Sequence, residues 1–183
     1  MDYLAELLAE HALSIDVTTL DANVCDASLR CLFDALTAAM AGQGAAGPVV
    51  ARKALPLLYG SGASPVWFSG KTAPLLGALL HNGLCTSALD LDDGNRLARG
   101  HPGASVIPAV LTLAATRGGT TVHDILSSII AGYDVGLRIA AAQRLEAIPT
   151  RQTGRWAAFA ACAAAGRLLK VSQLHLAQGL SIA

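Results

Sequence analysis

Apolar residues recur at spacings of three and four along nearly every segment of this chain, while alternating apolar and polar runs are almost absent. This spacing matches the 3.6 residues of a helical turn and not the two-residue repeat of a half-buried strand. The sequence therefore predicts an all-α fold in which the helices pack as a bundle. Only Val66, Trp67 and Phe68 have the character of an extended segment.

Turn signals divide the chain into eight predicted helices. Glycine-rich breaks at residues 42–47, 60–62 and 118–119 separate periodic segments. No internal repeat and no low-complexity linker is present, so residues 1–183 are predicted to form one helical domain. The expected helices cover residues 2–13, 27–41, 48–59, 73–89, 102–116, 122–144 and 154–169, and the last begins near Ser172.

The amino-acid composition limits the kinds of partner that this chain is expected to bind. Hydrophobic residues make up 53% of the chain and charged residues 14%, which argues against disorder and for helices buried on more than one face. Lys plus Arg equal Asp plus Glu at 13 each, so no basic excess favours nucleic acid. No apolar run reaches the roughly 18 residues of a membrane span, and the first residues are acidic. We expect a cytoplasmic protein that binds neither nucleic acid nor membrane.

The four cysteines and five histidines do not form a metal-binding pattern. The cysteines lie in apolar surroundings without CxxC spacing, so we expect buried thiols and neither a zinc site nor disulfides. His81 is expected in the core or behind the active site, and the other three outside the motif below are expected at surface or capping positions: His11, His123 and His175. No metal site is predicted.

One stretch, "ALDLDDGNRLARGHPGASVIPAVLTLA" at residues 88–114, gathers polar groups in this apolar chain. Asp90, Asp92 and Asp93 follow the apolar end of a predicted helix, where carboxylates oppose the helix dipole. Two explanations stay open at this point. The aspartates either form ion pairs with Arg96 and Arg99 or take part in function.

A calcium loop is the first functional explanation to consider for D-x-D-D-G. An EF-hand loop requires glycine at position 6 and glutamate at position 12. Counting from Asp90, these positions hold Asn95 and His101. The stretch is therefore not an EF-hand loop.

His101 immediately precedes Pro102, and proline favours the first turn of a helix. The imidazole is therefore expected at or next to a helix N-cap, near the free N–H groups of residues 103–105. Such N–H groups, together with Arg96 or Arg99, suit a carboxylate ligand. The alternative is a histidine that only caps the helix.

A second polar segment, "PTRQTGRWAAFAACAAAGRLL" at residues 149–169, precedes an alanine-rich helix. Arg151 and Gln152 are candidates for a second anion-binding loop, although solvated loop polarity explains such residues equally. Together the two segments give catalytic candidates Asp90 and His101, and substrate-binding candidates Asp93, Arg96, Arg99, Arg151 and Gln152.

The Asp-rich turn followed by His-Pro-Gly resembles the signature of the MmgE/PrpD family. The stretches "GYDVGLRIAAA" and "AAFAACAAAGRLLKVSQLHLAQGLSIA" resemble its next two helical blocks in the same order, and "DALTAAMAG" fits near the start. Members of this family include 2-methylcitrate dehydratase, cis-aconitate decarboxylase and iminodisuccinate epimerase. The resemblance implies a large all-helical domain, a cofactor-independent reaction and a homodimer or higher oligomer.

Carried onto this chain, the family's first motif aspartate falls on Asp90 and its motif histidine on His101. Three departures argue against cis-aconitate decarboxylation. Gly94 stands where the decarboxylase pattern has threonine, and Arg151 or Gln152 stands in place of a second family histidine. The loop before His101 is also one residue longer than in that pattern.

The resemblance implies a lyase of the dehydratase type that acts on a small di- or tricarboxylic acid by proton transfer beside a carboxylate. An isomerase or epimerase of the same family is the alternative activity. The family's later catalytic lysine and tyrosine, and its lid domain, belong to regions beyond this sequence, so we expect a fragment of a longer protein. A catalytically incomplete fragment or assembly subunit, or an unrelated helical binding module, are the remaining alternatives.

Overall fold

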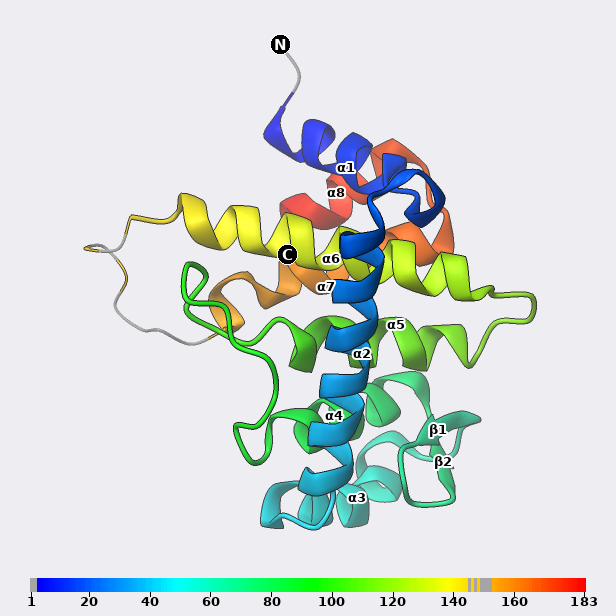
Figure 1. Cartoon of the computed structure of the whole chain (residues 1–183). Helices are drawn as coiled ribbons and strands as arrows, with labels where there is room; N and C mark the ends of the chain where they lie inside the picture. The colour runs from blue at the N-terminus through cyan, green and yellow to red at the C-terminus, as the bar shows by residue number, and fades with distance from the viewer. Residues whose placement is uncertain (1–2, 145, 147, 149–152) are drawn as a thin grey trace.

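The computed structural model describes residues 3–144, 146, 148 and 153–183. The described part of the chain forms eight α-helices, one short 3₁₀ helix and one two-stranded hairpin, which confirms the predicted helical fold (Figure 1). The α-helices are α1 (Leu4–Ser14), α2 (Ala22–Gly42), α3 (Ala46–Tyr59), α4 (Leu75–Ser87), α5 (Gly103–Ala114), α6 (Val122–Ala142), α7 (Gly154–Leu169) and α8 (Gln173–Ile182).

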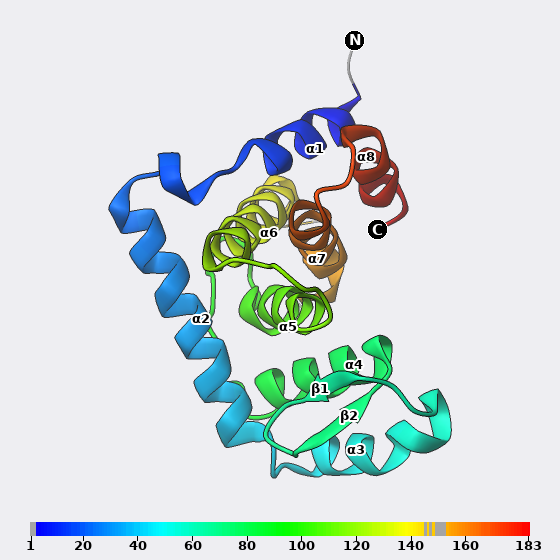
Figure 2. The ribbon, with the colours of Figure 1, turned by 90° about the vertical axis from the view of Figure 1, so that its right-hand side faces the viewer.

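Three helices, α5, α6 and α7, form the centre of the molecule (Figure 2). The pair α1 and α8 covers one side of this centre, and α4, α3 and the hairpin lie on the other side. Helix α2 runs across these layers and contacts α4, α5 and α6. The main core lies between α5, α6 and α7, and its buried residues include Val106, Ile107, Val110, Ile129, Trp156, Ala160, Ala164 and Leu168.

Small residues allow α6 and α7 to approach closely. A Cβ atom added at Gly132 would lie 2.8 Å from the Ala164 Cβ and 2.9 Å from the Ala160 carbonyl oxygen. At Gly136 it would lie 2.5 Å from the Ala160 Cβ. Glycine on α6 and alanine on α7 therefore set the distance between these two helix axes.

Helix α6 is also the one described helix long and apolar enough to cross a membrane by length and composition. It packs against α7, α5, α2 and α1, and half of its most apolar window is buried inside the fold. Its contacts with these four helices account for its apolar composition.

Local signals explain where the elements begin and where prediction and structure differ. The Asp21 side chain accepts the Asn23 N–H and starts α2 at Ala22, five residues before the predicted start. Strand β1 (Ser64–Val66) pairs antiparallel with β2 (Lys71–Ala73), so the expected extended run at 66–68 is wrong beyond Val66. Phe68 has a φ of 56°, because it lies in the turn that joins the strands.

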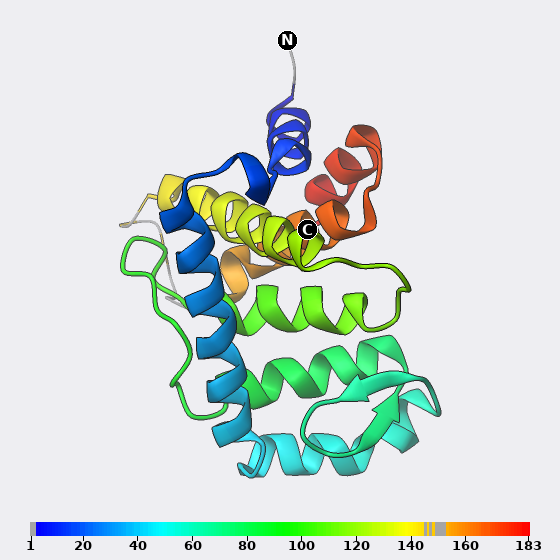
Figure 3. The same cartoon turned by 45° about the vertical axis from the view of Figure 1, so that its right-hand side comes forward.

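Helices α4 and α5 lie side by side and run in opposite directions (Figure 3). The chain between them, residues 88–102, forms a long irregular loop at one end of the pair. The polar motif thus occupies a connection on the surface of the bundle, held by rigid helices on both sides.

Candidate functional site

The loop from residue 88 to residue 102 is closed by its own backbone. Asn95 N–H donates to the Gly100 carbonyl over 2.9 Å, and Arg99 N–H donates to the Asn95 carbonyl over 2.7 Å. The Asn95 side chain also accepts the Ala98 N–H at 2.9 Å. These hydrogen bonds make residues 95–100 a compact turn directly before His101.

This turn is attached to the start of α7. Ala98 is buried in the main core, and His101 N–H donates to the Thr153 hydroxyl over 2.9 Å. A Cβ atom at Gly100 would lie 2.6 Å from the Thr153 Oγ1 and 3.1 Å from the Trp156 ring. Glycine is therefore needed at position 100 to bring His101 this close to α7.

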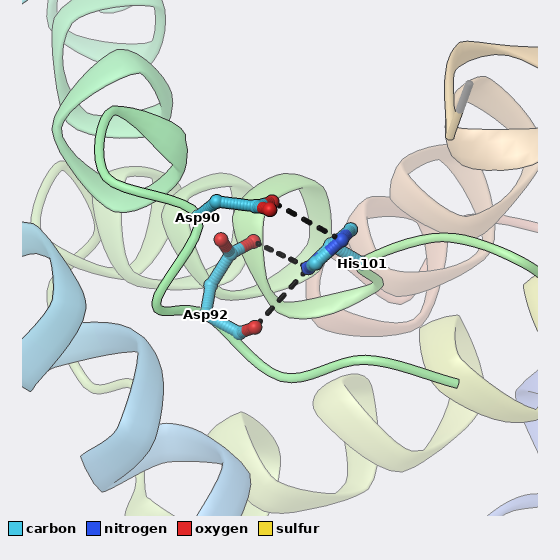
Figure 4. Close-up of side chains that lie close together, drawn as sticks. All are labelled: Asp90, Asp92 and His101. Atoms are coloured by element: carbon cyan, nitrogen blue, oxygen red, sulfur yellow. Dashed lines mark hydrogen bonds and ion pairs between the residues drawn. The ribbon is translucent and has the colours of Figure 1, made fainter. Parts of the chain in front are cut away.

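The His101 ring lies between two aspartates (Figure 4). Its Nδ1 is 3.1 Å from the backbone carbonyl oxygen of Asp92. Since a carbonyl oxygen only accepts, Nδ1 carries the proton of this hydrogen bond. Nε2 faces the Asp90 carboxylate, with 3.4 Å between Nε2 and Oδ1. The tautomer is thus set by Asp92, and Nε2 is the nitrogen available for chemistry in the neutral ring.

Burial and charge act in opposite directions on the His101 pKa. Burial lowers it, but the hydrogen bond to the Asp92 carbonyl and the charges of Asp92, Asp90 and Asp93 outweigh burial, and the pKa is raised. Burial raises the pKa of Asp92, whose side chain is only 1% exposed. The Asp90 side chain is 87% exposed, so it contacts solvent as well as the imidazole.

Asp93 serves the fold at the start of α5. Its Oδ1 accepts the Gly103 N–H at 2.8 Å, and its Oδ2 accepts the Tyr133 hydroxyl at 2.9 Å. His101 lies next to the N-cap Pro102 as predicted. The expectation of free N–H groups at residues 103–105 is wrong for Gly103, which donates to Asp93, and for Ser105, which donates to the Pro102 carbonyl. Because both Asp93 oxygens bind protein groups, we assign this residue to helix capping and not to substrate contact.

The two loop arginines share a surface pocket with His101. Arg96 and Arg99 line a hollow of about 550 Å³ together with Asn95 and His101. Across residues 3–144, 146, 148 and 153–183, no ion pair joins either arginine to a carboxylate. The structure therefore does not support the alternative in which these arginines pair with the motif aspartates. Arg99 has a φ of 53°, a conformation that costs energy for a residue with a side chain.

His101 also lines a second pocket. Its volume is about 240 Å³, and its walls include Asp90, Asp92, Ser105 and Thr153. In the described part of the site, His101 thus lines two pockets, one with Asp90 and Asp92 and the other with Arg96 and Arg99.

The sequence did not identify Asp92 and Thr153 as site residues. The usable signal for Asp92 is its place among the three motif aspartates; alternation does not single it out, because Asp90 has a φ of 55° and the segment is not an extended strand. Thr153 has no such signal, since it is 52 residues from its partner His101. Arg151 and Gln152 lie outside the described residues.

The remaining histidines lie away from this loop. His81 is fully buried on α4, which is one of the two locations expected for it. Its Nδ1 is 3.6 Å from the Cys85 sulfur. Burial lowers the pKa of His81 and raises the pKa of Cys85 to about 11. His11 forms an ion pair with Asp134 and so connects α1 with α6.

Residues 6–183 match the MmgE/PrpD N-terminal domain. No curated protein matches the chain significantly.

Proposed function

This chain belongs to the MmgE/PrpD family, and we propose that it carries the proton-transfer site of a dehydratase-type lyase for small di- or tricarboxylic acids. The observation that carries the proposal is the orientation of His101. Asp92 holds Nδ1, so Nε2 faces Asp90 and the 240 Å³ pocket. A histidine held in this way can transfer a proton in a defined direction.

Dehydration of a hydroxy acid needs two proton transfers. A base removes the proton from the carbon beside a carboxylate, and an acid protonates the departing hydroxyl group, so that an alkene and water form. We assign one of these two proton transfers to Nε2 of His101. Asp90, at 3.4 Å, stabilises the imidazolium that exists when the proton is on the ring.

Negative charge develops on the substrate carboxylate when the neighbouring carbon loses its proton. Arg96 and Arg99 line a pocket that His101 also lines, and they have no carboxylate partner among the described residues. We assign them to the substrate carboxylate, which a guanidinium can bind through two parallel hydrogen bonds. Arg151 and Gln152 stay candidates for the same role.

The proposal extends to the setting of the reaction. The transferred groups are protons and water, so the proposed steps use no cofactor. We also propose a homodimer or higher oligomer in the cytoplasm, with no nucleic-acid or membrane partner. An epimerase would use the same proton transfer and would differ in its product, which is an inverted stereocentre instead of an alkene.

The test is turnover of a panel of hydroxylated di- and tricarboxylic acids by the full-length natural protein that contains this chain, compared between the wild type and His101→Asn. We expect the variant to lose about 10²-fold or more of the turnover, because Asn can form hydrogen bonds but cannot transfer the proton. Mass and chiral analysis of the product separates loss of water from inversion.

His123→Asn is the matched control, because His123 is exposed at the start of α6, away from this site. It should retain wild-type turnover. Wild-type turnover in His101→Asn would remove His101 from the reaction and leave it as a residue that holds the loop.

A further inference from the structure

Asp90, Asp92 and His101 form a cluster with a second chemical capability. Each of the three offers one ligand atom, and these atoms all lie within 4.8 Å of one another (Figure 4). Two carboxylates and one imidazole are donors that a first-row divalent cation accepts. Exposed acidic groups often lie close together on protein surfaces without a bound ion.

The independent observation is the state of the Asp92 carboxylate. Its Oδ2 is buried and has no hydrogen-bond partner among the described residues. This oxygen points toward His101, with 3.7 Å between Oδ2 and Nδ1, which exceeds a hydrogen bond. A buried carboxylate oxygen without a partner costs free energy, and a cation held in the cluster would supply the missing partner.

The orientation of His101 also suits a metal ligand. Histidines that bind metals generally donate their other ring N–H to a carbonyl or carboxylate, and His101 Nδ1 donates in this way to the Asp92 carbonyl. Metal–ligand bonds of roughly 2.0–2.2 Å in a tetrahedral site place neighbouring ligand atoms about 3.3 Å apart. The distance from Nε2 to the Asp90 Oδ1 is 3.4 Å.

We infer that Asp90, Asp92 and His101 bind one divalent cation of the Zn²⁺ type, and that the bound cation inhibits the proposed reaction. The inhibition rests on the proposed function, whereas cation binding does not. A cation on Nε2 takes the electron pair that would accept a proton, so a filled site cannot transfer protons through His101. Only three protein ligands are present, which leaves a position for water or for a substrate carboxylate.

The ligand set predicts the order of cation affinities. A site made of nitrogen and oxygen ligands has a higher affinity for Zn²⁺ than for Mn²⁺. Mg²⁺ prefers six oxygen ligands in octahedral geometry and should bind weakly. Ca²⁺ needs six to eight oxygen ligands and should also bind weakly.

Binding is tested by calorimetric titration of the whole chain with Zn²⁺ and by electron paramagnetic resonance with Mn²⁺. Mn²⁺ does not favour thiolates, so it separates this site from the cysteines. We expect one Zn²⁺ per chain, and a loss of affinity of about tenfold or more in Asp92→Asn and in His101→Asn. Asp92→Asn is the sharper variant because it keeps the backbone carbonyl that holds Nδ1.

Two controls keep the result interpretable. His123→Asn should bind both cations as the wild type does, and circular dichroism should show that each variant retains its helices. In the wild type, Zn²⁺ should also protect His101 from acylation by diethyl pyrocarbonate, which tests the site without any substitution. Unchanged Zn²⁺ and Mn²⁺ binding in folded Asp92→Asn, or acylation of His101 at the same rate with Zn²⁺ present, overturns the inference.

Turnover distinguishes this inference from the proposed function. Inhibition of the wild type by Zn²⁺ that is relieved by a chelator supports both. Zn²⁺ binding at the three residues in a protein without turnover contradicts the proposed function alone. Turnover that depends on His101 but is indifferent to bound Zn²⁺ contradicts the inhibition alone.

Discussion

The backbone carbonyl of Asp92 decides which nitrogen of His101 faces the pocket. It accepts the Nδ1–H, so the other nitrogen is directed to Asp90. The next residue, Asp93, faces the start of α5 and Tyr133 instead. Two adjacent aspartates therefore have different tasks, one at the imidazole and one at the helix N-terminus.

The raised pKa of His101 predicts a pH dependence of stability. Burial lowers the folded-state pKa of His101, but the hydrogen bond to the Asp92 carbonyl and the nearby carboxylates outweigh burial, so this pKa lies above the ordinary value of 6.5. The folded state therefore holds the proton more tightly than the unfolded state. This contribution is fully present below pH 6.5 and is lost as the pH rises through the folded-state pKa.

Thermal unfolding at a series of pH values from 6 to 9 measures this effect. The wild-type midpoint should fall more over this range than the midpoint of His101→Asn, which has no proton to lose. Parallel curves for the two proteins would show that the carboxylates around His101 do not stabilise its charged form.

At the scale of the elements, the contact between α6 and α7 depends on the absence of side chains on α6. Gly132 and Gly136 lie one turn apart and face Ala160 and Ala164 of α7. Because α7 also holds Thr153 at its start, the position of α7 against α6 affects the loop that carries His101.

Gly132→Ala should destabilise the protein by about 1–3 kcal/mol, because the new methyl group overlaps a backbone carbonyl and two side chains that cannot move freely. Urea unfolding followed by circular dichroism measures the change. Gly154→Ala is the control, since nothing lies within 4 Å of a Cβ there and the substitution should be neutral or slightly stabilising. Equal midpoints for the two variants would refute close packing at Gly132.

At the scale of the whole molecule, large apolar side chains remain exposed. On α3, Leu57 is 88% and Leu58 is 70% exposed, and on α2 Phe33 is 67% exposed. Exposed apolar side chains gathered in patches are typical of surfaces that bind another protein copy or partner.

We therefore predict self-association of the chain into a dimer or a larger symmetric assembly. Sedimentation velocity over a range of concentrations should show a species of at least twice the mass of one chain. A single monomeric species at the highest concentration would contradict this prediction.

The helices and the place of the polar loop could be predicted from the amino-acid sequence alone. Both depend on local signals: the 3.6-residue period, caps such as Thr121 and Ser172, and the His-Pro-Gly start of α5. The start of α2 was missed because its Asp21 cap precedes a turn with a weak apolar period.

The separate roles of the polar residues depend on contacts between distant segments of the chain. Asp93 accepts a hydrogen bond from Tyr133, which is 40 residues away in the sequence, and His101 donates one to Thr153, which is 52 residues away. The packing of the chain also places Arg96 and Arg99 in a different pocket from the aspartates with which they could have paired. Such partners depend on how α4, α5, α6 and α7 pack, and contacts between distant segments leave no periodic trace in the order of the residues.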